Sequence, residues 1–327
     1  MILLLGATGM LGHNVLELML RQGRQVRCIV RQGSSIDSAV LAQAAEGQLE
    51  IVTGSILDYP LLERSINGCD EVVNCAGVTD MSLPRLDDFC PVNTDLPLQL
   101  ARLLDAAGGG TLVDVSTANT VRPGTKDSPS NEKMPFDEPF ASSLYAQSKR
   151  ESERALNGFA ASHPGTRVVI LLPGFMIGRY DRKPSSGKLL VSAYRKPLMA
   201  VTRGGKSFID ARDVASAVAG ALDNSLAQGR YLTTGNALSL KDFYSVQARV
   251  CNYRQKCFYI PRWACITVGK LGDWRERRGK QNLFTSRNVR QLLVEEYYDD
   301  SRARRELGLT CTPLEMSIKE FFAYHER

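Results

Sequence analysis

The sequence predicts a doubly wound α/β fold, in which helices cover both faces of a parallel sheet, with a smaller and mostly helical C-terminal lobe. Short apolar runs alternate with amphipathic segments over the first half of the chain, which is typical of such sheets. A chain of 327 residues is longer than one average domain, so it has room for a large α/β unit and an appended lobe.

The apolar runs are the expected strands, and the amphipathic segments between them are the expected helices. The strands are expected at residues 2–5, 25–30, 49–52, 71–75, 111–115 and 167–172. The helices are expected at residues 10–22, 58–67, 91–107 and 143–161. Pro91 suits the first turn of a helix, and the glycines at 108–110 suit its end.

The regular alternation stops at two places. Residues 119–142 are rich in proline and polar side chains, and so long a loop in a compact domain is usually functional or disordered. After residue 172 a Gly-, Lys- and Arg-rich segment intervenes before core-like sequence resumes at Phe208. We therefore expect a main domain of residues 1–173 plus 208–235, and a smaller lobe of residues 174–207 plus 236–327.

Composition and charge exclude several classes of protein. Hydrophobic residues make up 43% of the chain and charged residues 23%, which is ordinary for a soluble globular protein. The net charge of +6 is scattered apart from a cluster around Arg275, Arg277, Arg278 and Lys280, and no nucleic-acid recognition motif accompanies it. A solvated helix face explains the cluster, so no nucleic-acid partner is expected.

The cysteines and the N-terminus indicate a cytoplasmic protein. None of the eight cysteines forms a C-x-x-C pair, so we expect buried thiols in a reducing compartment and no metal site. The first apolar run has no basic stretch before it, and no segment approaches the ~18 continuous apolar residues of a membrane span. The chain is therefore expected to be soluble and to lack an integral membrane segment.

The glycine turn after the first strand is the strongest local signal. Gly6, Gly9 and Gly12 stand in the spacing G-x-x-G-x-x-G between an apolar run and a helix-compatible segment, which is typical of the opening of a dinucleotide-binding βαβ unit. Such glycines allow a tight turn, close approach of a pyrophosphate to the backbone, and helix–strand packing. The N-terminus of the helix offers unpaired N–H groups to the phosphates.

Tyr145 and Lys149 are a second candidate group, because residues four apart share one face of a helix. An ammonium near a phenol lowers the phenol pKa, which suits proton exchange with an alcohol or carbonyl oxygen during hydride transfer. Ser116 and Thr117 follow the apolar run 111–115, where a hydroxyl can reach a ligand at the carboxyl end of a parallel sheet. Each motif is common by chance, so the evidence for a functional site comes from the order in which the motifs follow one another along the chain.

In this order the features resemble the extended branch of the short-chain dehydrogenase/reductase family, over most of residues 1–235. Thr117 or its neighbour Ser116, Tyr145 and Lys149 match the family's catalytic residues, and aligning the family's S-S-A with Ser116-Thr117-Ala118 favours Thr117. Asn93 resembles a recurring asparagine of the fourth helix. Further matching segments are Asn74-Cys75-Ala76-Gly77, Pro173-Gly174, Ile177-Gly178 and Phe208-Ile209-Asp210-Ala211-Arg212-Asp213-Val214-Ala215.

A narrower likeness concerns residues 181–188, which read D-R-K-P-S-S-G-K. They are similar to a P-T-P-T-G-[RK] stretch of dihydroflavonol-reductase-like proteins, a group that includes hopanoid-associated epimerase-like sequences. The likeness favours a ketone or aldehyde reductase over a sugar-nucleotide epimerase, and the alternative is a polar linker that matches by chance.

The resemblance implies that the main domain is a Rossmann domain that binds NAD(P) and that the smaller lobe binds the substrate. The implied cofactor contacts are Gly6, Thr8, Gly9, Met10, Leu11, Gly12, Arg31, Ser55, Ile56, Ala76, Gly77, Thr117, Tyr145, Lys149, Pro173, Gly174 and Met176. Ser55 stands where the family often has an aspartate for the adenine, and Asp58 is expected to cap the next helix.

Arg31 decides the expected cofactor. It follows the second strand, where an acidic residue would bind the ribose 2′-hydroxyl of NAD(H). An arginine suits a 2′-phosphate, because its guanidinium makes paired charged hydrogen bonds. We therefore expect NADP(H), with NAD(H) as the alternative.

These observations predict a cytoplasmic NADPH-dependent oxidoreductase that reduces a ketone or aldehyde of a small organic substrate, with Tyr145 as general acid/base. Lys149 is expected to bind the nicotinamide ribose and to lower the Tyr145 pKa, and a homodimer through the fourth and fifth helices fits the family. The alternatives are a nucleotide-sugar epimerase or dehydratase with tightly bound NAD(P), and a non-catalytic NADP-sensing protein. A lipid dehydrogenase that docks at membranes is a further alternative, since the moderately apolar segment 258–274 fits either a docking surface or a core helix.

Overall fold

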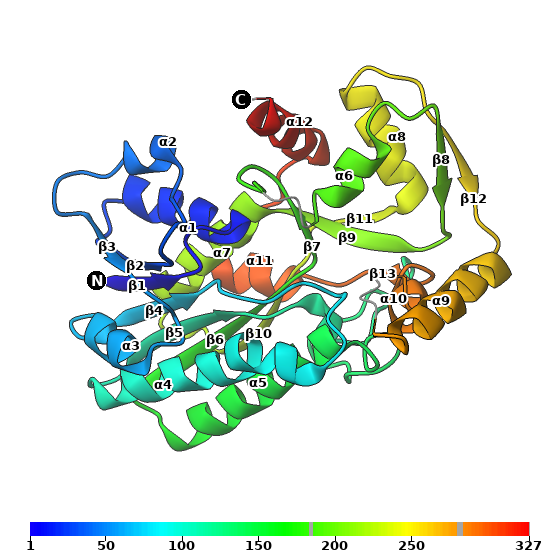
Figure 1. Ribbon diagram of the computed structural model, residues 1–327. Coiled ribbons are helices and arrows are strands. Elements are labelled where there is room, and N and C mark those ends of the chain that lie inside the picture. The colour runs from blue at the N-terminus through cyan, green and yellow to red at the C-terminus, as the bar shows by residue number, and fades with distance from the viewer. Residues whose placement is uncertain (183–185, 280–283, 327) are drawn as a thin grey trace.

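The computed structural model describes residues 1–182, 186–279 and 284–326, and it confirms the predicted parallel α/β fold (Figure 1). A seven-stranded sheet has the strand order β10-β6-β5-β4-β1-β2-β3, and each neighbouring pair is parallel. Its strands are β1 (Ile2–Leu5), β2 (Val26–Val30), β3 (Leu49–Thr53), β4 (Glu71–Asn74), β5 (Gly110–Val115), β6 (Thr166–Pro173) and β10 (Gly229–Thr233).

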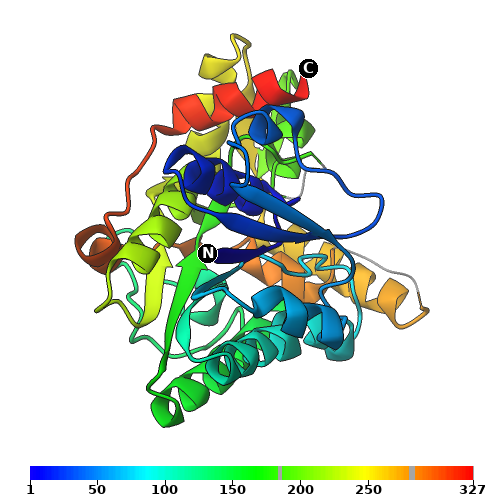
Figure 2. The same cartoon turned by 90° about the vertical axis from the view of Figure 1, so that its left-hand side faces the viewer.

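Helices cover both faces of this sheet (Figure 2), because successive strand residues point to opposite sides. On β1, Ile2 and Leu4 pack into one core cluster, whereas Leu3 and Leu5 pack into the other. The first cluster lies under α1 (Met10–Arg21), α7 (Ala211–Asp223) and α11 (Ser301–Leu307). The second lies under α3 (Tyr59–Ile66), α4 (Leu96–Ala106) and α5 (Leu144–Ser162).

The expected helices are present with small changes at their ends. The helix expected over 91–107 is a π-helical turn at Pro91–Asp95 that continues into α4, and a short helix that was not predicted, α2 (Ser38–Leu41), follows β2. Asp58 caps α3 as expected, since its carboxylate accepts a hydrogen bond from the Leu61 amide at 3.3 Å.

The smaller lobe contains short strands as well as the expected helices. Its strands are β7 (Phe175–Ile177), β8 (Leu198–Val201), β9 (Gly205–Asp210), β11 (Asn236–Ser239), β12 (Lys256–Tyr259) and β13 (Glu295–Glu296). Its helices are α6 (Lys188–Ala193), α8 (Leu240–Val250), α9 (Arg262–Glu276), α10 (Ser286–Gln291) and α12 (Leu314–His325). Phe208, Phe243 and Phe321 are fully buried in a core of their own.

Residues 208–235 contribute to both parts of the molecule. β9 pairs with β7, β11 and β13 of the lobe, whereas α7 packs on α1 and β10 forms the edge of the main sheet. The proline-rich segment 119–142 is tied to the C-terminal half, because Gly124 and Ser130 form β-bridges with Tyr297 and Tyr298. Within the described ranges, every helix is too short or too polar to span a bilayer.

The order of the strands fixes where a ligand can bind. From β1 the chain proceeds to β2 and β3 on one side of the sheet, and β4, β5 and β6 lie on the other. Ligands of such sheets bind outside the carboxyl ends of the strands, where the order reverses. The glycine turn after β1 and the segments after β4 and β5 all lie at this edge.

Candidate active site

The glycine turn is shaped by contacts that leave no room for side chains at two of its three positions. Gly6 has a positive φ of +78°, and a Cβ there would lie 2.7 Å from the Ala76 nitrogen. A Cβ on Gly12 would lie 2.0 Å from the Gly6 carbonyl oxygen. Gly9 is exposed, and the nearest atom to a Cβ there would be 3.4 Å away. Internal packing therefore requires Gly6 and Gly12, whereas Gly9 exposes bare backbone at the surface.

The same turn opens α1 with free N–H groups. Gly9 is the N-cap residue and supplies no side-chain hydrogen bond to the first turn. Unpaired amides at a helix N-terminus attract an anion such as a pyrophosphate. Around it, Thr8 and Met10 are half-buried and Leu11 is buried.

We predict that Gly12→Ala destabilises the protein, because its methyl group would overlap the Gly6 carbonyl. Overpacking of this kind costs about 1–3 kcal/mol, which lowers the melting temperature of a chain of this size by several degrees. Gly158→Ala in α5 is a matched control, since a Cβ there has nothing within 4 Å and alanine favours a helix. Equal melting temperatures for the two variants would contradict the packing argument.

Tyr145 lies at the start of α5, beside the end of β5. The Thr117 hydroxyl lies beside its phenol, and the Asn119 amide donates to the Thr117 hydroxyl oxygen at 3.3 Å. Burial raises the pKa of Tyr145 to about 12, and the hydrogen bond from Thr117 opposes this rise only in part. Tyr145 is therefore protonated at neutral pH.

Lys149 is buried one helical turn after Tyr145, and its ammonium donates to the Val115 carbonyl at 2.8 Å. Burial lowers the pKa of Lys149, while the Asp114 and Glu153 carboxylates raise it. Lys149 is not among the groups that shift the Tyr145 pKa, so the expected lowering of that pKa by Lys149 is not seen; burial of the phenol is the largest effect.

The side chains of Ser116 and Asn93 both form hydrogen bonds with other groups of the protein. The Ser116 hydroxyl donates to a Glu153 oxygen at 2.5 Å, so it points away from Tyr145 and leaves Thr117 as the hydroxyl beside the phenol. The Asn93 side chain bonds both backbone groups of Val78, at 2.8 and 3.0 Å, and donates to Ser148 at 3.1 Å. Asn93 therefore holds the loop after β4 against α5.

Asp114 is a buried carboxylate that the sequence analysis did not single out. It lies on β5 opposite Asn74 of β4, and the Asn74 amide donates to its Oδ1 at 2.7 Å. Burial raises the pKa of Asp114, and the nearby Lys149 ammonium lowers it. The sequence signal was a charged residue inside the apolar run 111–115.

The remaining expected cofactor contacts also follow strand ends. Ala76 is buried beside Gly6, and a Cβ on Gly77 would lie 3.7 Å from the Lys149 ammonium. Pro173 ends β6, and Gly174 lies close to the Ser207 carbonyl and Thr234. Three further residues are less enclosed: Met176 in β7 and Ile56 after β3 are half-buried, and Ser55 is exposed.

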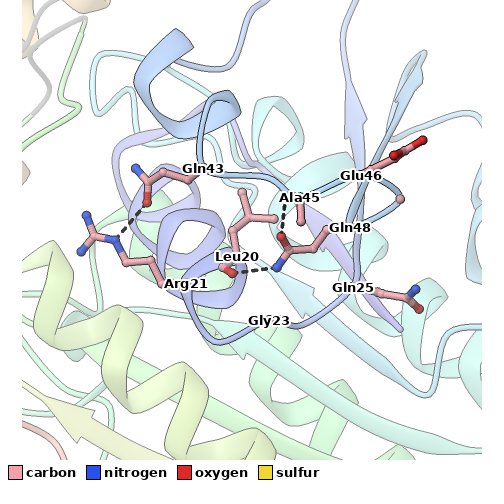
Figure 3. Close-up of a pocket in the computed structure, with 9 residues that line it drawn as sticks. Leu20, Arg21, Gly23, Gln25, Gln43, Ala45, Glu46 and Gln48 are labelled. Carbon is pink, nitrogen blue, oxygen red and sulfur yellow. Dashed lines mark hydrogen bonds between the residues drawn. The ribbon is translucent and has the colours of Figure 1, made fainter.

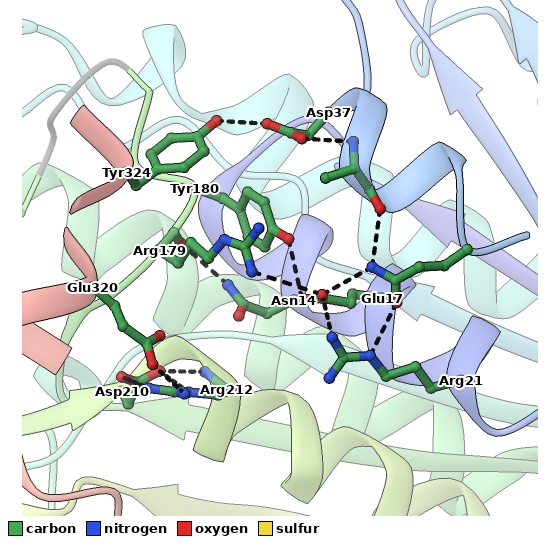
Figure 4. A network of polar contacts seen from close by, with 12 residues as sticks. Asn14, Glu17, Arg21, Asp37, Arg179, Tyr180, Asp210, Arg212, Glu320 and Tyr324 are labelled. Carbon is green, nitrogen blue, oxygen red and sulfur yellow. Dashed lines mark hydrogen bonds and ion pairs between the residues drawn. The ribbon is translucent and has the colours of Figure 1, made fainter. Parts of the chain in front are cut away.

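Arg31 is exposed directly after β2, on a loop that is held from several sides. His13 of α1 is buried, lies 3.0 Å from the Gly9 carbonyl through Nδ1, and accepts the Asp37 amide at 3.0 Å through Nε2. Tyr324 of α12 donates to the Asp37 carboxylate at 3.0 Å (Figure 4). The loop that carries Arg31 is therefore anchored both to the glycine turn and to the C-terminal helix.

A small indentation lies beside Tyr145, and α10 supplies part of its lining. Arg287 and Asn288 of α10 line it together with Met81 and Leu83, and the Asn288 amide donates to the Met81 carbonyl at 3.0 Å. No local motif marks α10, because its role depends on a contact between residues about two hundred positions apart in the chain.

A larger hollow between the C-terminal end of α1 and the loop before β3 is not a candidate site (Figure 3). Its residues include Gln25 and Gln48, which precede β2 and β3. It therefore lies at the amino ends of the strands, opposite to the edge where parallel sheets bind ligands. Among the described residues, no group of His, Cys, Asp or Glu could hold a metal ion.

Residues 2–232 match the family model described as "NAD dependent epimerase/dehydratase family". The chain belongs to this family. The match spans the glycine turn, Thr117, Tyr145 and Lys149, and it confirms the resemblance to extended short-chain dehydrogenases/reductases. The chain is accordingly an NAD(P)-dependent enzyme of this class. The stretch similar to dihydroflavonol-reductase-like proteins includes residues 183–185, which lie outside the described residues.

Several known proteins resemble almost the whole chain. "Sterol demethylase protein B" of Methylococcus capsulatus is 26% identical over 98% of this chain and 97% of its own length. "Putative dihydroflavonol 4-reductase" of Synechocystis is 25% identical over 96% and 91%. The crystal structure of gox2253 has the same fold, with a TM-score of 0.82 and 20% identity over 99% of this chain and 97% of that one.

Proposed function

We propose that the protein is an NADPH-dependent reductase of a ketone or aldehyde on a small organic substrate. The observation that carries this proposal is the placement of Thr117 beside Tyr145 at the carboxyl edge of the sheet, with Lys149 one helical turn further along α5. A phenol that keeps its proton at neutral pH suits donation to a carbonyl oxygen. The relative named a dihydroflavonol 4-reductase supports the direction of the reaction.

The residues at the edge fit the cofactor. The N–H groups at the start of α1 and the bare backbone of Gly9 would hold the pyrophosphate, and Arg31 would hold the 2′-phosphate. Lys149 would bind the nicotinamide ribose. Bound NADPH supplies a hydride to the carbonyl carbon.

The chain's own residues handle the proton. Tyr145 gives its phenol proton to the carbonyl oxygen as that oxygen gains charge, so an alcohol forms and a tyrosinate remains. The Thr117 hydroxyl donates a hydrogen bond to the same oxygen and orients it for this transfer. Solvent then returns a proton to Tyr145. The indentation between α10 and the loop after β4 supplies the wall beside the reacting carbonyl.

A direct test is NADPH consumption with a panel of ketones and aldehydes, followed by identification of the alcohol. A nucleotide-sugar epimerase of the same family recycles its cofactor within one turnover. It would therefore copurify with tightly bound NAD(P) and show no net NADPH consumption. A non-catalytic NADP-sensing protein would bind NADPH and convert no carbonyl compound.

Arg31→Asp should reverse the cofactor preference. The substitution removes the charged hydrogen bonds to the 2′-phosphate and supplies an acid for the ribose 2′-hydroxyl. We expect the affinity ratio for NADP(H) over NAD(H) to fall by about 100-fold, which corresponds to ~2.7 kcal/mol. Titration of each cofactor by fluorescence or calorimetry measures the ratio.

Arg64→Asp is the matched control for Arg31→Asp, because Arg64 is exposed on α3 and the charge change is the same. It should leave the preference unchanged. An unaltered ratio in Arg31→Asp would remove Arg31 from the cofactor site.

We further propose that the protein is cytoplasmic and forms a homodimer that pairs through α4 and α5. Light scattering of the purified protein measures its mass in solution and so tests the dimer.

A further inference from the structure

Helix α9 exposes large apolar side chains along its outer side. Trp263 is 71% exposed, Leu271 50% and Trp274 49%, and Ile266 and Val268 are also exposed. Contiguous exposed apolar residues of this size are unusual and mark an interaction site. In Figure 1, α9 lies at the end of the molecule opposite α2 and β3.

The outward direction of these side chains follows from the inner side of α9. Its buried residues are Cys265, Gly269 and Gly272, which recur at helical spacing and are all small. They allow α10 to approach closely, since a Cβ on Gly269 would lie 2.9 Å from the Ser286 Cα. The large apolar residues therefore occupy the remaining positions of the helix, which face solvent.

The charged residues on α9 and just after it are also divided between the inner and the outer side of the helix. Both acidic residues are used on the inner side: Asp273 accepts the Ser286 amide at 2.8 Å, and Glu276 pairs with Arg287 at 2.6 Å. The basic residues are exposed, and they are Arg262, Lys270, Arg275, Arg277 and Arg278. The Arg278 guanidinium lies 3.7 Å from the Trp274 ring centroid. The outer side is thus apolar, aromatic and positively charged.

The exposed apolar surface continues into the strand that precedes α9. Phe258 of β12 and Leu198 of the paired strand β8 are exposed, and they stand on the same side of this sheet because Leu198 pairs with Lys256, two residues before Phe258. The exposed apolar residues of α9 and these two residues together form what we call the α9 face. They lie in adjacent segments of the lobe at one end of the molecule (Figure 1).

We propose that the α9 face docks the protein at the surface of a lipid bilayer that contains anionic lipids. Tryptophan favours the headgroup region, the other apolar side chains enter the acyl boundary, and arginine and lysine attract anionic headgroups. A nucleic acid would use the basic residues and could stack on the tryptophans, but it offers nothing to Ile266, Val268 and Leu271. The bilayer therefore accounts for every exposed residue type on this face.

Docking at a bilayer would bring part of the lining of the active-site indentation to the membrane. α10 packs on α9, and its Arg287 and Asn288 line the indentation beside Tyr145. The loop that carries Arg31 follows β2 and lies toward the opposite end, so the α9 face would not block the cofactor. For the reductase proposed above, this arrangement favours apolar carbonyl compounds that partition into membranes; the docking itself does not depend on that activity.

The chain offers a direct optical test, because its two tryptophans are Trp263 and Trp274 and both lie on the α9 face. The full-length protein is mixed with vesicles of phosphatidylcholine alone or with phosphatidylglycerol added. With the anionic vesicles we expect a blue shift of the tryptophan emission, quenching by lipids brominated in their acyl chains, and reversal by high salt. Unchanged emission with anionic vesicles would overturn the proposal.

A pair of variants locates the contact. Leu271→Asp places a charge on the α9 face and should weaken vesicle partitioning by about tenfold or more. Leu226→Asp is the control, because Leu226 is 87% exposed in the loop before β10 and does not belong to this face. Both variants should keep the melting temperature of the unaltered protein, since both positions are exposed.

Three other outcomes would contradict the membrane as the occupant of the α9 face. They are an equal loss of partitioning in both variants, an emission shift caused by nucleic acid but not by vesicles, and an emission shift that follows protein concentration without lipid. The last would identify a second copy of the chain as the partner.

Discussion

Replacing Tyr145 with phenylalanine should abolish turnover and leave cofactor binding intact. The phenol is the proton donor in the proposed reduction, and the ring of phenylalanine keeps the packing but has no proton to give. General acid catalysis contributes about 10²- to 10⁴-fold, so kcat should fall by at least about 100-fold. Steady-state NADPH consumption measures kcat, and NADPH titration measures binding.

Tyr253→Phe is the matched control for Tyr145→Phe, because Tyr253 follows α8 in the lobe and its phenol donates to the Ala193 carbonyl at 3.4 Å, outside the residues proposed for the site. It should keep full activity. If Tyr145→Phe kept full turnover, Tyr145 would not be the acid. If it lost NADPH binding as well, the tyrosine would be part of the cofactor site to a greater extent than the proposed mechanism requires.

The main sheet could be predicted from the sequence because its strands and its glycine turn have local sequence patterns. The strands of a parallel sheet are buried on both faces and read as apolar runs, as Ile2–Leu5 does. Gly6 and Gly12 could be predicted because a tight turn against a second strand leaves them no space for a Cβ. The family resemblance then added the catalytic residues, and the family match confirms that resemblance.

The lobe and its role in the site could not be predicted in the same way. Residues 258–274 were compatible with a core helix or a docking surface, because overall hydrophobicity does not say which side of a helix is buried. In the structure, small residues such as Gly269 are buried and the tryptophans are exposed, which reverses the usual amphipathic pattern. Asn288 reaches the site through a contact with Met81 that no sequence spacing reveals.

Replacing Lys149 with methionine should remove turnover and lower stability, because the buried ammonium stabilises the charged form of the buried Asp114 carboxylate. Asp114 is fully buried, and burial already raises its pKa while Lys149 lowers it. Leaving a buried polar group without the favourable interaction that it had costs about 1–3 kcal/mol. Chemical denaturation measures this loss, and NADPH consumption should fall to background because the ribose contact is gone.

The loss of stability in Lys149→Met should depend on pH, and the direction of this dependence follows from the pKa of Asp114. Without Lys149 the pKa of Asp114 should rise further above its ordinary value of about 4, so the folded state holds a proton that the unfolded chain releases. Stability then decreases as pH rises from about 4 through the folded pKa. The destabilisation of Lys149→Met should therefore be smallest in acid and greatest at neutral pH.

The double variant Lys149→Met with Asp114→Asn separates the two roles of the lysine. Asparagine has no charge to compensate, and its side-chain oxygen can still accept the hydrogen bond from Asn74 that Oδ1 of Asp114 accepts at 2.7 Å. The double variant should recover most of the free energy of unfolding lost in Lys149→Met and lose its dependence on pH. It should remain inactive, because the substitution at Asp114 restores charge balance but not the contact to the ribose. If the double variant were as unstable as Lys149→Met alone, Asp114 would not be the group that Lys149 neutralises. If it regained turnover, the contribution of Lys149 to catalysis would lie in holding Asp114 rather than in binding the cofactor.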